Sequence, residues 1–192
     1  DDWNPLDYGK DIDWKRPFLA QLQELWKEVP DIAVLNINPV NSDYCSITEG
    51  NKNCYLVFGG DFNENSLYST YIFNSKECVD TYWVSKSELN YETVDCISCA
   101  RLCYSRYCDD CYDSAFLFNC KNCHDCFGCV NLKNKSYCFF NEQLTKEEYQ
   151  KRLKEVNLGD TKQIAELKEK FAKFFINFPR RFARLIQTVN ST

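Results

Sequence analysis

The sequence predicts a mainly β fold, a parallel β-solenoid flanked by amphipathic α-helices. Two observations carry this prediction. From Ser42 to Asn141 the sequence aligns without gaps in rows of twelve residues. Each row contains one short β-prone run, such as CYLVF at 54–58, followed by a polar stretch that is typical of turns. A strand and a turn repeated at a fixed period indicate a solenoid, because stacked coils bring each column of residues into register about 4.8 Å apart.

The columns of the alignment support this stacking. Cysteine recurs at positions 96, 108 and 120 of one column and at 99, 111 and 123 of another. Asparagines align in the same way, for example Asn51 with Asn63. Ladders of identical residues are favoured where equivalent positions of successive coils lie side by side.

The size of one coil is less directly visible. A coil of twelve residues is about 40 Å around, which is too narrow to hold large side chains. Rows 42–141 contain 19 aromatic residues, and we expect many of them to be buried. The sequence therefore predicts a coil of about 24 residues and about four coils. The alternative is an antiparallel meander with one strand in each row, in which neighbouring rows pair.

Residues 1–41 are predicted to form an N-terminal helical cap. Within 17–29 the apolar residues Phe18, Leu22, Leu25, Trp26 and Val29 fall on one helical face. Pro17 suits a helix start, and Pro30 ends the helix. We expect this helix to cover an end of the solenoid that would otherwise expose an unpaired strand.

Residues 142–192 are predicted to form a C-terminal helical segment. Thr145 and Glu148 have the spacing of a capping box and open a helix that ends at Asn157–Gly159. Asp160 or Thr161 caps a second helix, which Pro179 breaks. The apolar face of this helix consists of Ile164, Leu167, Phe171, Phe174 and Phe175. The remaining residues look extended or truncated.

The composition limits the classes of function. The chain has 192 residues, a net charge of −5 and a mean hydropathy of −0.50. Residues 1–141 carry −9 and residues 142–192 carry +4. The net charge argues against a generally basic nucleic-acid binder, and no run of 18 apolar residues predicts a membrane span. Because there is no Met and Asp1 comes first, we expect a fragment or a processed chain.

Thirteen cysteines are the strongest candidates for chemistry, and they leave three interpretations open. Two groups have zinc-like CxxC spacing. A ladder of free thiols is the second interpretation, since a buried cysteine behaves as a small hydrophobe. Disulfides are the third, although the odd number disfavours complete pairing, and we expect a reducing, cytoplasmic location. The candidate zinc ligands are Cys96, Cys99, Cys120 and Cys123 in one group and Cys108, Cys111, Cys126 and Cys129 in the other.

Three other features are weaker candidates. His124 lies between Cys123 and Cys126, where it could activate a thiol or bind zinc, but a turn residue is the simpler interpretation. Acidic residues such as Asp80 and Glu92 could serve a carbohydrate-active enzyme, although a 24-residue coil places those two on different sides. A basic and aromatic cluster could contact nucleic acid. That cluster consists of Arg180, Arg181 and Arg184 with Phe178 and Phe182.

Three stretches carry a resemblance to a known family: the first 25 residues, NKNCYLVF at 51–58, and KNCHDCFGCVNLKNKSYCFFNEQLTKEEY at 121–149. They resemble uncharacterised cysteine-rich repeat proteins of candidate-phylum bacteria and large phages. The resemblance implies a zinc-ribbon-like segment before Asp1 and further Cys/Asn rows after Thr192 in longer members. It supports the repeat and a zinc or nucleic-acid context, and it brings no known activity or catalytic residues.

The sequence favours a non-enzymatic binding or structural scaffold that contacts a protein partner or a larger assembly. A zinc-binding, nucleic-acid-associated protein is the alternative, and a carbohydrate-active β-helix enzyme is the second alternative. The sequence identifies no catalytic residue and no cofactor other than zinc. It leaves the oligomeric state open.

Overall fold

The computed structural model describes residues 4–180, and the chain divides into two units, Asp1–Leu35 and Asn36–Thr192. The first unit contains a short 3-10 helix, η1 (Pro5–Tyr8), and helix α1 (Phe18–Glu28). No residue of α1 is buried, and Trp26 is 71% exposed. The predicted helix is confirmed, and its role as a cap of the solenoid stays a prediction.

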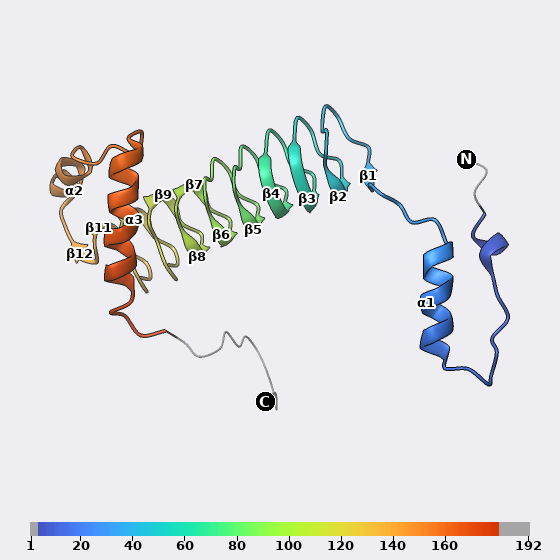
Figure 1. Cartoon of the computed structure of the whole chain (residues 1–192). Coiled ribbons are helices and arrows are strands. Elements are labelled where there is room, and N and C mark those ends of the chain that lie inside the picture. Colours follow the sequence, from blue (N-terminus) through green and yellow to red (C-terminus); the bar gives the residue numbers. More distant parts are fainter. Residues whose placement is uncertain (1–3, 181–192) are drawn as a thin grey trace. The chain divides into compact units, whose positions relative to one another are not determined.

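The described part of the second unit consists of short strands followed by two helices, α2 (Lys146–Leu153) and α3 (Thr161–Phe175) (Figure 1). Its strands are β1 (Asn36–Ile37), β2 (Ser46–Glu49), β3 (Tyr55–Asp61), β4 (Leu67–Phe73), β5 (Tyr82–Ser85), β6 (Val94–Ile97), β7 (Ala100–Cys103), β8 (Arg106–Asp109), β9 (Tyr112–Ala115), β10 (His124–Phe127), β11 (Ser136–Phe139) and β12 (Glu142–Gln143). No described helix is both long and apolar enough to cross a membrane.

The strands form a parallel β-solenoid, as the sequence predicts. One sheet has the order β1-β2-β3-β4-β5-β6-β8 and the other β12-β11-β10-β9-β7. Each strand pairs in parallel with residues twelve positions away, as in Cys96↔Cys108 and Cys126↔Cys138, and only β12 is antiparallel to its partner. The predicted 24-residue coil is therefore wrong: one row of twelve residues is one coil, and there are about nine coils instead of four.

A three-residue repeat closes the coil within twelve residues. Every third residue from Asn38 to Phe140 has a positive φ near 50–60°, in the left-handed region. A left-handed residue between extended ones bends the chain, so four such residues close one coil. The residue after each bend points inward; Cys54, Val57, Gly60 and Asn63 are successive examples, and all are buried. The other two residues of each triplet face outward.

The aromatic residues explain why the predicted coil is too large. The coils of β2–β5 hold their aromatic side chains outside, where Tyr44 is 72% and Trp83 53% exposed. The interior contains no aromatic side chain in these coils; cysteine, serine, threonine, asparagine and aliphatic residues up to the size of leucine fill the core. A narrow coil is sufficient because nothing large has to fit inside it.

The inward side chains also complete the backbone hydrogen bonding between coils. The amide N–H of Asn63 donates to Asn51 Oδ1 at 2.9 Å, and that of Cys54 donates to Ser42 Oγ at 3.1 Å. Both acceptors lie on the preceding coil. A buried N–H without a partner is costly, so the interior favours small side chains with an acceptor atom.

The two C-terminal helices begin where the sequence predicts. Thr145 and Glu148 form the capping box of α2, and the side chain of Asp160 accepts the N–H of Lys162 at the start of α3. Helix α2 ends at Leu153, earlier than the expected Asn157–Gly159. The N–H of Lys154 still donates to the carbonyl of Gln150, but those of Glu155 and Val156 donate to carbonyls only three residues earlier. Tyr149 of α2 is buried against the last coils.

Candidate functional site

Twelve of the thirteen cysteines lie inside the solenoid, and only Cys103 faces outward. Each of the twelve donates its S–H to the backbone carbonyl two residues earlier, at 3.3–3.7 Å. Inward serines such as Ser66 and Ser69 make the same bond at 2.8–3.1 Å. Cysteine and serine therefore make the same hydrogen bond in this interior, which explains why they alternate within one column.

The interior keeps isolated thiols protonated. Burial raises the pKa of Cys78 to about 11, although the amide of Asn90 that donates to its sulfur opposes part of this rise. Burial also raises the pKa of Cys54 and Cys138. A raised pKa disfavours the thiolate, which is the form that binds metals and attacks electrophiles.

The predicted zinc ligands gather in one thiol cluster, but their grouping differs from the prediction. Cys96 and Cys99 lie two coils away from Cys120 and Cys123, and the coil of Cys108 and Cys111 lies between them. Direct stacking of the two outer pairs is therefore wrong, because it relied on a 24-residue coil. Members of the two predicted groups are stacked on each other, since Cys96 pairs with Cys108 and Cys111 lies on the coil next to that of Cys123. Among residues 4–180 no group of three or more His, Cys, Asp or Glu side chains is arranged to hold a metal, and zinc at these cysteines stays a prediction.

His124 points away from the cysteines beside it. It begins strand β10 instead of lying in a turn, and its ring stacks on Tyr112 with 5.3 Å between ring centres. Its Nδ1 lies 3.1 Å from a carboxylate oxygen of Asp125. Since Cys123 and Cys126 are buried inside the coil, the structure does not bring them to this ring.

The other weak candidates are placed as follows. Asp80 and Glu92 lie on one face of adjacent coils, contrary to the expected separation, because Val79 pairs with Tyr91. Glu92 forms an ion pair with Lys168 of α3 at 2.7 Å. Arg180 lies 4.2 Å from the ring centre of Phe175, while Arg181 and Arg184 lie outside the described residues, so nucleic-acid contact stays a prediction.

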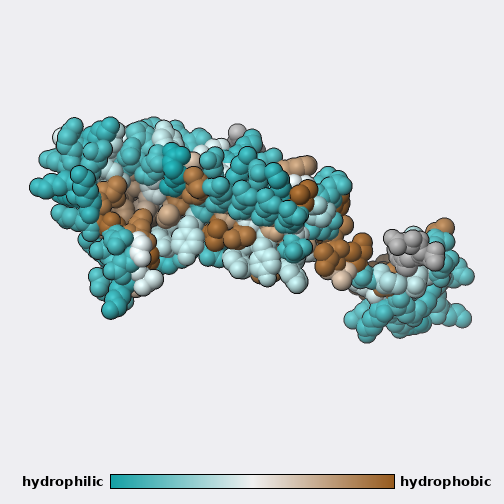
Figure 2. All heavy atoms as spheres, turned by 90° about the horizontal axis from the view of Figure 1, so that it is seen from above, coloured by the Kyte–Doolittle hydropathy of each residue, from teal (hydrophilic) through white to brown (hydrophobic). Residues whose placement is uncertain are grey.

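An exposed row of aromatic residues is the largest feature that the sequence analysis did not assign. We call it the aromatic side; Figure 2 shows such pale and brown side chains gathered along one side of the coils. Its rings contact one another across coils, as Tyr55 does with Tyr68 and Tyr71 with Trp83, at 5.8 and 5.5 Å between ring centres. It consists of Tyr44, Tyr55, Phe58, Tyr68, Tyr71, Tyr82 and Trp83, each 38–72% exposed.

Helix α3 covers the continuation of the aromatic side. Phe116 occupies the same column as Tyr68, four coils later, yet it is 2% exposed where Tyr68 is 53% exposed. Phe171 of α3 packs on Phe116, and Phe175 packs on Phe118, with 5.8 and 4.7 Å between ring centres. Lys168 lies 4.5 Å from the ring centre of Tyr104.

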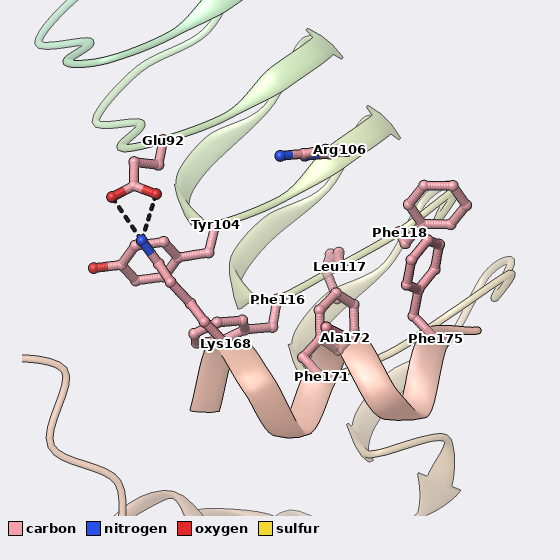
Figure 3. A pocket seen from close by; sticks show the side chains of 10 residues that line it. All are labelled: Glu92, Tyr104, Arg106, Phe116, Leu117, Phe118, Lys168, Phe171, Ala172 and Phe175. Carbon is pink, nitrogen blue, oxygen red and sulfur yellow. Dashed lines mark hydrogen bonds and ion pairs between the residues drawn. The ribbon is translucent and has the colours of Figure 1, made fainter. Parts of the chain in front are cut away.

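A pocket of about 360 Å³ lies between α3 and the solenoid (Figure 3). Ala172 faces its middle from the helix, opposite the buried Leu117. Glu92 and Lys168 close one end, and burial together with Glu92 raises the pKa of the neighbouring Tyr104 to about 12. The complete lining is Glu92, Tyr104, Arg106, Phe116, Leu117, Phe118, Lys168, Phe171, Ala172 and Phe175.

Comparisons with known proteins identify no family. No protein-family model matches the sequence, and no curated protein matches it. Among solved structures, one similar chain is a UDP-N-acetylglucosamine acyltransferase from Campylobacter jejuni. It is 8% identical, with a TM-score of 0.29 over 74% of this chain and 91% of the other. The resemblance to cysteine-rich repeat proteins stays a prediction.

Proposed function

We propose that this protein is a non-enzymatic binding scaffold, and that its aromatic side docks an amphipathic helix of a partner protein. The main evidence is a difference in solvent exposure between equivalent positions on successive coils. Tyr68 is half-exposed on an early coil, whereas Phe116 is buried beneath a helix in the same column. An exposed row of seven large aromatic side chains is typical of a surface that binds another protein.

Helix α3 indicates the chemistry of the partner. Its Phe171 and Phe175 are four residues apart, so both lie on one helical face and reach rings of neighbouring columns. Lys168 on the same face approaches both Tyr104 and the carboxylate of Glu92. We therefore expect a partner helix with aromatic residues at i and i+4 and a lysine or arginine one turn before them.

Charge complementarity supports a basic helix. Residues 1–141 carry a net charge of −9, and the exposed carboxylates of Asp43 and Asp80 border the aromatic side. Opposite charge on the partner speeds association and selects its orientation. Thirteen free cysteines support a reducing compartment, and we include a cytoplasmic location in the proposal.

A peptide with the sequence of residues 160–178 is a suitable probe, because this segment already fits the same columns. The labelled peptide is titrated with the full chain, and binding is followed by fluorescence anisotropy. Tyr68→Ser and Trp83→Ser should each weaken binding about tenfold or more, since buried aromatic anchors dominate such interfaces. Leu89→Ser and Ile97→Ser are matched controls, because both side chains are exposed to 41% but lie outside the aromatic side.

The outcomes separate the possible occupants. Equal affinity for the wild type and for Tyr68→Ser and Trp83→Ser would refute docking on the aromatic side. Sedimentation of the full chain provides a second measurement. A dimer that Trp83→Ser dissociates would mean that a second copy occupies this surface, which contradicts the proposed partner.

A further inference from the structure

The pocket beneath α3 exists because one helical position is small. Where α3 packs on the solenoid, Lys168 meets Glu92 and Tyr104 at one end, and Phe175 meets Phe118 at the other. Between them Phe171 packs on Phe116, and beside it the exposed Ala172 presents only a methyl group to the pocket (Figure 3). The helix therefore leaves a pocket of about 360 Å³ beside these contacts. This volume is within the range of pockets that bind small molecules.

The walls of the pocket suit a flat ring. Tyr104 and Phe116 stack with 4.8 Å between their ring centres and an angle of 24° between their planes. Phe171 and Phe175 close the side that α3 provides, with 6.3 Å between their ring centres. Aromatic faces on two sides favour a planar apolar group over a branched one, because rings stack best on rings.

The charges at the rim favour one negative charge on the ligand. Glu92 and Lys168 neutralise each other at 2.7 Å. Arg106 lines the pocket as well, is exposed, and makes no ion pair with any residue in 4–180. The lining thus carries one excess positive charge. A guanidinium binds a carboxylate or phosphate through two parallel hydrogen bonds.

We propose that this pocket binds a planar aromatic or heteroaromatic small molecule with a single anionic group. The ring lies among Tyr104, Phe116 and Phe171, and the anionic group binds Arg106. This site is separate from the aromatic side, so the proposal does not depend on the docking of a partner helix.

Naphthalene-2-carboxylate is a suitable probe, and naphthalene-2-carboxamide has the same shape without the charge. Calorimetric titration of the full chain should give one site, with the carboxylate about tenfold tighter than the amide. Arg106→Gln should remove this difference and leave amide binding unchanged. Lys133→Gln makes the same change of charge at an exposed position outside the pocket and serves as its control.

A second variant tests the cavity itself. Ala172→Leu fills the space over Leu117 and should abolish binding of both probes, while the protein stays folded because a cavity is filled instead of created. Ala165→Leu is the matched control, since Ala165 is exposed on α3 and does not line the pocket. Unchanged binding by Ala172→Leu, or equal binding of carboxylate and amide by the wild type, would overturn the proposal.

Discussion

The buried thiols should make the solenoid unstable in alkali. In the unfolded chain a cysteine has a pKa of about 8.5. Burial raises the folded-state pKa of Cys45, Cys54, Cys78 and Cys138, that of Cys78 to about 11. A group with a raised folded pKa contributes its full stability below the unfolded pKa. That stability is lost as the pH rises toward the folded pKa, here between about 8.5 and 11.

The size of the effect follows from proton linkage. At pH 9.5 an unfolded thiol is about ten parts ionised to one part protonated, which favours unfolding by about 1.4 kcal/mol for each thiol that stays protonated when folded. Cys78 alone contributes about 1.4 kcal/mol, and the raised pKa values of Cys45, Cys54 and Cys138 add to this loss in the same direction. With a urea dependence of about 2 kcal/mol per molar, the midpoint of unfolding should fall by about 0.7 M or more between pH 7.5 and 9.5.

Urea unfolding of the full chain at pH 7.5, 8.5 and 9.5, followed by circular dichroism with reductant and without oxygen, measures this shift. The double variant Cys54→Ser/Cys78→Ser is the internal control, because serine at the adjacent coils already makes the same carbonyl bond. It should lose the contribution of Cys78, about 1.4 kcal/mol at pH 9.5, together with that of Cys54. A midpoint that does not move with pH, or the same slope in the double variant, would refute the assignment of protonated thiols.

Three further predictions follow from the coil. Cys78→Ser should lower the free energy of unfolding by about 1 kcal/mol or less, whereas Cys78→Val should lower it by about 1–3 kcal/mol because it leaves the N–H of Asn90 without an acceptor. Urea unfolding at pH 7 measures both losses. Equal losses would contradict the role of the sulfur as an acceptor. Repeating residues 78–89 as an extra coil should leave the chain folded, whereas one residue inserted between Cys108 and Cys111 should break the register and unfold the later coils. Circular dichroism measures both, with an insertion after Pro179 as the control. Equal tolerance of all three changes would contradict the solenoid. A thiol reagent should label at most Cys103 rapidly in the native protein and all thirteen cysteines in denaturant, and elemental analysis should find no zinc. One or two zinc ions per chain, together with thiols that react only after a chelator has removed the zinc, would support the CxxC ligands instead.

The twelve-residue register and the helix starts could be predicted because each depends on local chemistry. Columns such as Cys96 and Cys108 repeat since they are neighbours in space, and the bonds between Thr145 and Glu148 depend on only four residues. The course of α3 over the later coils, where the columns of the aromatic side continue, could not be predicted in the same way. It depends on which exposed rings Phe171 and Phe175 meet, and nothing in the spacing of these two residues identifies Phe116 or Phe118.

The size of the coil could also have been predicted from the sequence, because a period of three residues runs within the period of twelve. Positions three apart, such as Ser66, Ser69, Ile72 and Ser75, are small or aliphatic, and all are buried. The residue before each inward position is asparagine, aspartate or glycine in about half of the cases, which are the residues that tolerate a left-handed conformation. A period of three within a row of twelve predicts four bends in each coil, and hence no room for aromatic rings inside.

This backbone also explains why the interior must be polar and sulfur-rich. Of the thirty-five left-handed positions in the three-residue series from Asn38 to Phe140, thirty-two are not glycine, and each that is not asparagine or aspartate costs about 1–2 kcal/mol. A single coil cannot offset four such residues, because its amides and carbonyls point toward the coils above and below. The offset comes from stacking, in which Asn63 bonds Asn51 and Ser75 bonds Asn63 from coil to coil. At many inward positions the residue is small and carries an acceptor atom, a role that cysteine can fill without binding a metal, while Val57, Ile72 and Leu102 are apolar exceptions. The outward positions are free of this demand, and the large aromatic side chains of the coils of β2–β5 lie there.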